Sequence, residues 1–409
     1  MAKVENKFIH KLSSGYHFTA LTLVNMLVAL FVLNIILFAI FSASDHFRRD
    51  PVSAEFGHST VNSAYPGLSE SEINALLKET WSRPYIYEPY TQFKERQYQG
   101  YYVNVDTNGF RATKNQGTWP PQREKLNIFL FGGSTMFGYG VADDQTVASY
   151  LQESLMTKLN QDVRVYNFGR GDYYSTQERI LYENILVSGV IPDVAIFVDG
   201  LNDFYYNTNE PLFTGRFREF VDKGKGSTSV TDFISKTSLG RAARGLRYRF
   251  TNLFQEDLHS ERQNEKKDVD LNTTRKYADP KTFDAVIQRY LQNKKLIEAA
   301  SESFDVTPIF VWQPVPTYHY DQHYHLFSEG GYGKHSYSQY GYERIAELLQ
   351  ETPLGDNFLW CADIQKNKTV PLYIDTVHYS DSFSKELAIE IADLIINRSL
   401  IVGTDQMTK

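Results

Sequence analysis

The stretch NIFLFGGST, residues 127–135, decides the fold. A short continuous apolar run that ends in glycines and a hydroxyl residue is typical of a buried parallel strand followed by a tight turn. Four similar runs follow: VRVYNFG (163–169), DVAIFVDG (193–200), TPIFVWQ (307–313) and PLYID (371–375). Helical patterns at 145–159, 177–189 and 382–400 fit the crossover helices that parallel strands need. The sequence therefore predicts an α/β fold, a flavodoxin-like three-layer α/β/α sandwich around a parallel sheet.

Composition excludes several classes of protein. The chain has 409 residues, of which 42% are hydrophobic and 22% charged, as in globular proteins. A net charge of -7 argues against nucleic acid as the main partner. The single cysteine, Cys361, excludes an internal disulfide and a zinc site built from cysteines.

An uncharged apolar segment lies near the amino terminus. Residues 20–41 contain no charged side chain, and a helix of this length spans a hydrocarbon core of about 30 Å. We expect a short cytoplasmic segment (1–18), a single transmembrane helix (19–43) and an extracytoplasmic remainder. A cleaved signal peptide is the alternative, because small residues at 42–44 offer a cleavage site. The flanking charges, Lys3, Lys7 and Lys11 against Arg48 and Arg49, favour a cytoplasmic amino terminus only slightly.

The remaining chain divides into three parts. Residues 44–124 form a juxtamembrane extracytoplasmic region, in which Asn108-Gly109 predicts a tight hairpin turn. Residues 125–400 carry the α/β pattern, interrupted by a polar stretch at about 205–282. This stretch is either a cap over the site or a solvated excursion. Residues 401–409 are a tail.

Four polar blocks lie at or just after the ends of predicted strands: Gly132–Thr135, Asn167–Asp172, Gly200–Asp203 and Asp375–His378. Ligands of doubly wound sheets bind outside the carboxyl ends of the strands, and in the strand order 2-1-3-4-5 the first strand lies between the second and third. We therefore expect the first three blocks to meet there.

The residue types in these blocks suit attack on an ester. Ser134 is the candidate nucleophile, His378 the base, and Asp375 the group that orients the imidazole. The oxyanion needs preorganised donors, which the backbone N–H of Ser134, a backbone N–H of Gly171 or Asp172 and the side-chain amide of Asn202 would supply.

Together these blocks resemble the SGNH, or GDSL, hydrolase superfamily over roughly residues 126–398. In that family a Ser-His-Asp triad acts with an oxyanion hole formed by Gly and Asn. Here Gly133 stands where the family usually has Asp before the nucleophile, and the family glycine of the second block corresponds to Gly171 or Asp172. The resemblance implies a membrane-anchored serine esterase without a cofactor or metal.

The expected substrate is an acylated small molecule or glycan, plausibly an O-acetyl ester of an envelope polysaccharide. Two alternatives remain open: an O-acyltransferase that uses the same acyl-enzyme, and a non-catalytic module that binds glycan or assembles the envelope. His319, His323 and His325 have a spacing that could bind a transition metal, but a loop near the site or plain surface is the preferred interpretation.

Overall fold

In a computed structural model, residues 2–46, 50–222, 237–240, 242–243 and 277–401 are described. The chain divides into two compact units, residues 1–48 with 217–271 and residues 49–216 with 272–409. The first unit contains helix α1 (Ala2–His46), in which Tyr16–Ser42 is long and apolar enough to cross a membrane. Its apolar side chains are exposed, including Phe31 and Phe38 at 66% each. Such a helix fits a membrane anchor and a signal sequence alike.

The second unit is built around a five-stranded sheet in which every neighbouring pair of strands is parallel. Its members are β5 (Leu126–Gly132), β6 (Val163–Asn167), β7 (Val194–Asp199), β8 (Thr307–Trp312) and β9 (Phe358–Trp360). The spatial order is β6-β5-β7-β8-β9, which is the predicted order 2-1-3-4-5. The switch point therefore lies at β5, whose carboxyl end leads directly into Ser134.

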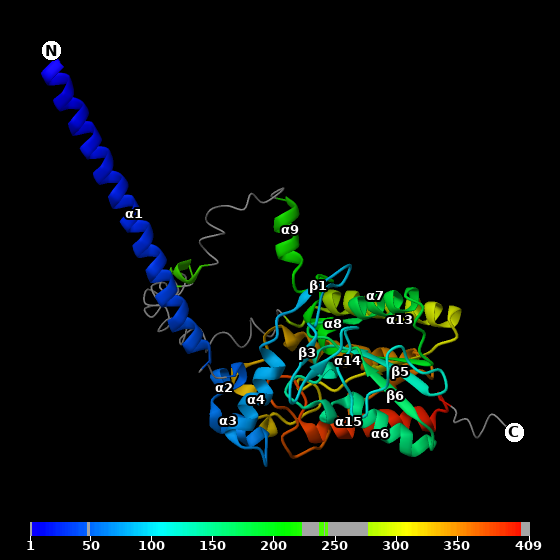
Figure 1. Ribbon diagram of the computed structural model, residues 1–409. Helices are drawn as coiled ribbons and strands as arrows, with labels where there is room; N and C mark the ends of the chain where they lie inside the picture. Colours follow the sequence, from blue (N-terminus) through cyan, green and yellow to red (C-terminus); the bar gives the residue numbers. More distant parts are fainter. Residues whose placement is uncertain (1, 47–49, 223–236, 241, 244–276, 402–409) are drawn as a thin grey trace. The chain divides into compact units, whose positions relative to one another are not determined.

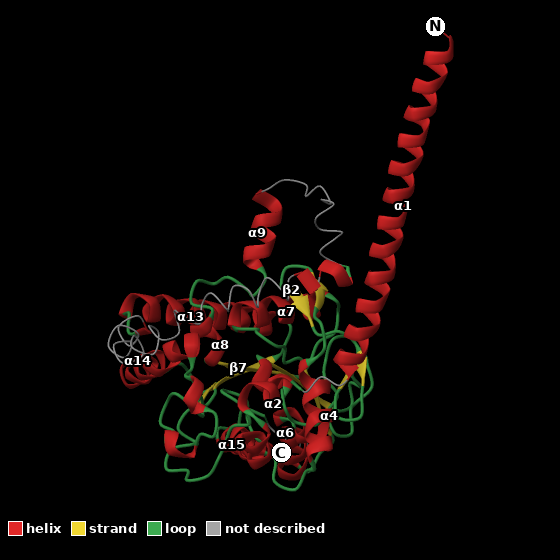
Figure 2. Cartoon of the chain, turned by 90° about the vertical axis from the view of Figure 1, so that its left-hand side faces the viewer, coloured by secondary structure: helices red, strands yellow, loops and turns green. Residues whose placement is uncertain are grey.

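Helices cover both faces of this sheet, as Figure 2 shows around β7. Helices α7 (Ser175–Val187) and α13 (Pro280–Ser303) lie on one face, and α6 (Val147–Leu159) and α15 (Asp381–Asn397) on the other (Figure 1). Phe129 and Phe131 of β5 pack in the core of the first face, with α14 (Tyr337–Glu351). Ile128 and Leu130 pack in the core of the second face. Alternate side chains thus serve opposite layers, and the predicted three-layer α/β/α fold is confirmed.

The region between residues 50 and 105 packs onto this domain. It contains α2 (Pro51–Phe56), α3 (His58–Ala64), α4 (Glu70–Trp81) and two small antiparallel pairs, β1 (Ile86–Glu88) with β2 (Gln92–Lys94) and β3 (Tyr98–Gln99) with β4 (Asn104–Val105). Helix α4 begins with a capping box between Ser69 and Glu72, which fixes where the helix starts. Its Leu76 and Leu77 share a buried cluster with Ile374, the residue before Asp375.

Of two local predictions, one is wrong and the other is confirmed. PLYID is not a strand of the sheet: Ile374 N donates to the carbonyl of His378 at 2.9 Å and Ser380 N to that of Leu372 at 2.8 Å, so the segment bonds to itself. The fifth strand is β9 instead. The predicted hairpin turn at Asn108-Gly109 is present, with Gly109 at φ 85°. Beside it Val105 and Arg111 form an antiparallel bridge, Asp106 N donates to the carbonyl of Phe110 at 2.9 Å, and Ala112 N donates to that of Asn104 at 2.8 Å.

The predicted excursion at 205–282 falls largely outside the described residues. Its described parts include the end of α8 (Leu201–Tyr205), α9 (Thr214–Asp222) and the start of α13.

Candidate active site

The strand β5 places Ser134 at the carboxyl edge of the sheet. Gly133 precedes the short helix α5 (Ser134–Phe137), so the N–H of Ser134 is one of the first N–H groups, which lack an acceptor within the helix. Ser134 is only partly buried, whereas its neighbours Gly133 and Thr135 are buried. The fold therefore fixes the backbone here while leaving the serine side chain accessible.

The turn after residue 372 brings a histidine and a carboxylate to this serine. His378 Nε2 lies 2.7 Å from Ser134 Oγ, and His378 Nδ1 lies 2.7 Å from Asp375 Oδ2. Asp375 Oδ1 accepts the backbone N–H groups of Val377 and His378, each at 2.9 Å. Burial alone would raise the pKa of Asp375, but His378 and these N–H groups hold it below its ordinary value. Three residues expected from the sequence thus form one row of hydrogen bonds.

The side chain of Asn202 lies against Gly133, the residue before the candidate nucleophile Ser134. Its Nδ2 donates to the backbone oxygen of Tyr173 at 2.7 Å. A Cβ added to Gly133 would lie 2.4 Å from this Nδ2, so only glycine leaves room for the amide. The amide carries a second N–H, which remains for a ligand.

The turn at 169–172 contains the two backbone N–H groups that were predicted as oxyanion donors, those of Gly171 and Asp172. They differ in whether an acceptor is already bound. Gly171 N donates to Glu95 Oε1 at 3.2 Å. Asp172 has a left-handed backbone at φ 61°, and for its N–H the described part of the chain offers no acceptor. Its carboxylate accepts the hydroxyls of Tyr85 at 3.0 Å and Tyr206 at 2.8 Å. The N–H of Asp172 is therefore the freer of the two candidates.

Glu95, from the region before the sheet, is a buried residue that sequence reasoning missed. Besides Gly171 N, its Oε1 accepts the hydroxyl of Tyr139 at 3.1 Å, and its Oε2 faces Arg83 Nη1 at 3.4 Å. The side chain is 2% exposed. Burial raises the pKa of Glu95, although Arg83 and the N–H of Gly171 act to lower it. No pattern in the sequence marks this glutamate, because it lies in a segment without periodicity.

Aromatic rings enclose the imidazole of His378. The ring of Trp81 meets it edge-on at 5.1 Å between centroids, and the ring of Tyr139 stacks on it at 5.5 Å. Behind the site, Gln313 Oε1 accepts the hydroxyls of Thr135 and Tyr379, each at 2.8 Å. Gln313 thereby ties the residue after the nucleophile to the residue after the base.

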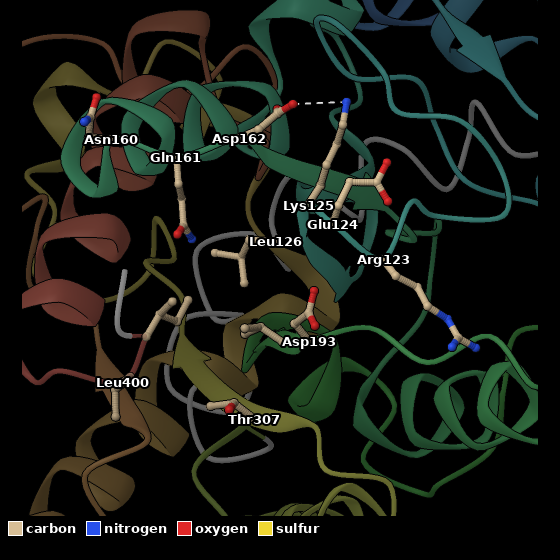
Figure 3. A pocket seen from close by; sticks show the side chains of 12 residues that line it. Arg123, Glu124, Lys125, Leu126, Asn160, Gln161, Asp162, Asp193, Thr307 and Leu400 are labelled. Atoms are coloured by element: carbon tan, nitrogen blue, oxygen red, sulfur yellow. Dashed lines mark ion pairs between the residues drawn. The ribbon is translucent and has the colours of Figure 1, made fainter. Parts of the chain in front are cut away.

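A cavity of about 480 Å³ lies beside His378. Its walls come from α2, Trp81, Tyr205, residues 331–335 and residues 375–378. A larger cavity of about 720 Å³ lies at the amino ends of the strands, where Leu126, Val194 and Thr307 line it (Figure 3). Lys125 and Asp162 form an ion pair of 3.0 Å at its rim. Because ligands of such sheets bind at the carboxyl ends, the smaller cavity belongs to the candidate active site.

The three histidines of the 319–325 segment are dispersed. His319 Nδ1 pairs with Asp363 Oδ1 at 2.5 Å, and His325 Nδ1 accepts the N–H of Phe327 at 3.1 Å. His323 is exposed. Among the described residues no group of three or more His, Cys, Asp or Glu side chains is arranged to hold a metal ion.

No protein-family model matches the chain, and no curated protein is significantly similar in sequence. Solved structures that are similar in fold include a lipolytic protein of the G-D-S-L family from Desulfitobacterium hafniense DCB-2, with 12% identity over 66% of this chain and 99% of that one and a TM-score of 0.33. A lipase from a goat rumen metagenome has 10% identity over 68% of this chain and 99% of its own, with a TM-score of 0.36. The acetylxylan esterase Axe2 from Geobacillus stearothermophilus has 13% identity over 69% and 96%, with a TM-score of 0.34. These similarities concern the fold alone.

Proposed function

We propose that the chain is a serine esterase of the SGNH type, with Ser134, His378 and Asp375 as its catalytic residues. The observation that supports this most directly is the row of hydrogen bonds from Ser134 Oγ through His378 to Asp375, with both links at 2.7 Å. A serine hydroxyl is a weak nucleophile until a neighbouring base takes its proton, and this row supplies the base and the group that orients it.

The reaction then follows in two steps. Ser134 Oγ attacks the ester carbonyl as its proton passes to His378 Nε2, and Asp375 stabilises the imidazolium. The N–H groups of Ser134 and Asp172 and the Nδ2 of Asn202 hold the oxyanion. His378 returns the proton to the leaving alkoxide, which departs as the alcohol. In the second step His378 activates water, which cleaves the acyl-enzyme to the free acid and Ser134.

For the substrate we propose an O-acyl ester, plausibly O-acetyl, on a glycan or envelope polysaccharide. For the location we propose a single-pass anchor with a cytoplasmic amino terminus and an extracytoplasmic catalytic domain. The apolar segment Tyr16–Ser42 of α1 supports the anchor. We retain the division into 1–18, 19–43, 44–124, 125–400 and 401–409 as part of this proposal, although residues 50–105 pack against the hydrolase core.

The test uses the full chain in detergent, a short p-nitrophenyl ester and a serine-directed phosphonate. We expect turnover and covalent labelling of the wild type, and loss of both in Ser134→Ala. Ser303→Ala, an exposed serine in α13, is the matched control. A wild type that is folded but neither turns over nor labels would leave only the non-catalytic glycan-binding alternative. Labelling with turnover only when a glycan acceptor is added would identify an acyltransferase.

The topology needs its own experiment. An alkaline phosphatase fusion after residue 50 should be active if the region beyond the helix is exported. An inactive fusion that is expressed at normal levels would exclude the extracytoplasmic location.

A further inference from the structure

The cavity beside His378 lies on one particular side of the reacting atoms. In triad chemistry the histidine that deprotonates the serine later protonates the leaving oxygen, so the alcohol half of the ester must lie next to that histidine. Residues 375–378, including His378, line the cavity, whereas Gly133 and Asn202, beside the oxyanion, are not among its lining residues. If Ser134, His378 and Asp375 act as proposed, this cavity receives the alcohol and not the acyl group.

The walls of the cavity include aromatic rings and apolar side chains. Trp81 and Tyr205 contribute the rings, and Val52 and Phe56 of α2 contribute aliphatic and aromatic surface. Its volume of about 480 Å³ falls in the range of small-molecule sites, about 300–1,000 Å³. Aromatic side chains pack well against the C–H face of a sugar ring, whose hydroxyl groups then point outward toward polar partners.

His335 is one of the polar groups that such a ring would meet, and Glu55 and Lys334 also line the cavity. It lies in a turn of 3-10 helix (Gly333–Ser336) and lines the same cavity as His378. The ring of Tyr205 covers it at 4.6 Å between centroids. Burial, helped by the nearby His378, lowers the pKa of His335 to about 4. At neutral pH its imidazole is therefore uncharged, with one nitrogen that donates and one that accepts.

One nitrogen of this ring has no partner. His335 Nδ1 is buried, and it forms no hydrogen bond with any described residue. Buried polar atoms almost always have a partner, because leaving one unpaired is costly. His335 lines the cavity, so rotation of its ring about the Cβ–Cγ bond would bring this unpaired nitrogen to a ligand that carries hydroxyl groups.

From these observations we propose that the cavity is the subsite for the alcohol half of the ester, that this alcohol is a sugar ring, and that His335 hydrogen-bonds its hydroxyl groups. The proposal rests on the proposed esterase function and adds the place where the sugar of the ester binds and a residue that selects it. His335 acts on the leaving group, so its replacement should change the choice between esters that share an acyl group.

The experiment compares two acetate esters with the full chain in detergent. One is a mono-O-acetylated methyl glucopyranoside with free neighbouring hydroxyls, and the other is p-nitrophenyl acetate, whose alcohol is aromatic. In His335→Ala we expect the ratio of kcat/KM for the sugar ester to that for the aryl ester to fall about tenfold, as loss of one ordinary hydrogen bond implies. His335→Asn should restore part of the ratio, and His323→Ala, an exposed histidine of the preceding loop, should leave it as in the wild type.

A ratio that does not change in His335→Ala would overturn the role of this residue. A wild type that cleaves the aryl ester but not the sugar ester would overturn the assignment of the alcohol. Binding separates these failures from failure of the esterase function. Saturation-transfer NMR with methyl glucopyranoside should detect contact with Ser134→Ala and lose it in Ser134→Ala/His335→Ala. Such binding in a chain without any ester turnover would retain the subsite and refute the esterase, and absence of binding would refute the subsite.

Discussion

Replacing Glu95 tests whether the region before the sheet helps to form the oxyanion site. In the structure this side chain accepts Gly171 N at 3.2 Å and the Tyr139 hydroxyl at 3.1 Å, and it faces Arg83 Nη1 at 3.4 Å. Glu95→Ala removes the acceptor of two hydrogen bonds and the ion-pair partner of Arg83 at a position that is 2% exposed. Breaking a buried ion pair on one side costs about 3–5 kcal/mol of unfolding free energy. Glu95→Gln keeps an amide oxygen for Gly171, so we expect a smaller loss of about 1–3 kcal/mol.

The effect on catalysis follows from the position of Gly171. Its N–H anchors the turn that presents the N–H of Asp172, and without the anchor this donor shifts away from the oxyanion. Loss of one oxyanion donor lowers kcat by about 10²–10³. We therefore expect Glu95→Ala to lower kcat by about 100-fold with little change in KM, because the lost contact forms mainly in the transition state. Glu95→Gln should lose less than about tenfold in kcat, since the acceptor remains.

The assay measures kcat and KM with p-nitrophenyl acetate, and urea unfolding on the same preparations. Glu153→Ala is the control, because Glu153 is an exposed partner of Lys114. Glu95→Ala protein that is folded under the assay conditions and retains the wild-type kcat would refute the positioning role, even if its unfolding free energy fell. A fall in kcat that Glu95→Gln does not restore in part would also contradict the argument.

Three further changes have clear expected outcomes. Gly133→Ala should lower kcat strongly while the chain still folds, because its Cβ would press on Asn202 Nδ2 at 2.4 Å; Gly215→Ala, with open space around it, is the control, and equal kcat values would contradict the clash. Since the pKa of His335 is lowered from 6.5 to about 4, the unfolded chain takes up this proton first as the pH falls through that window. As the pH falls from 6.5 to 4, the unfolding free energy should therefore fall by at most about 1.4 kcal/mol per pH unit, and by less where water in the cavity screens the ring. In His335→Gln the unfolding free energy should depend less steeply on pH. Equal slopes for the two proteins in urea titrations would refute this. Cys361 is 1% exposed and burial raises its pKa, so a thiol reagent should label it only on unfolding, and rapid labelling of the native chain would contradict this.

Much of the sheet could be predicted because its strands have a distinctive sequence pattern. Strands buried on both faces require continuous apolar runs, as in residues 128–131, and few other structures produce such runs. The first three polar blocks could be located as well, because each comes at the carboxyl end of such an apolar run. The proximity of Ser134 and Asn202 therefore follows from strand order alone.

Short or self-bonded segments escaped prediction. Strand β9 has only three residues, Phe358–Trp360, too few for any periodicity to register. PLYID has the apolar character of a strand, yet it begins with Pro371, which has no N–H. Its Ile374 N–H bonds to the carbonyl of His378 and not to a neighbouring strand. Glu95 and Trp81 act through tertiary contacts made over long sequence separations, and no local spacing encodes such contacts.

Two stretches of chain form the candidate active site, because residues 50–105 contribute side chains to it. The α/β portion supplies Ser134, His378 and Asp375, the proposed catalytic residues. The earlier stretch supplies the ring edge against His378 and the acceptor for Gly171 N. A polypeptide starting at the first strand would thus keep the ring of Tyr139 on the imidazole of His378, lose the ring of Trp81, and leave Gly171 N without its acceptor. Exchange of residues 51–81 between related chains would instead change the walls of the proposed alcohol subsite and leave Ser134 in place. Selection can then act on the preference for the alcohol separately from the cleavage of the ester bond.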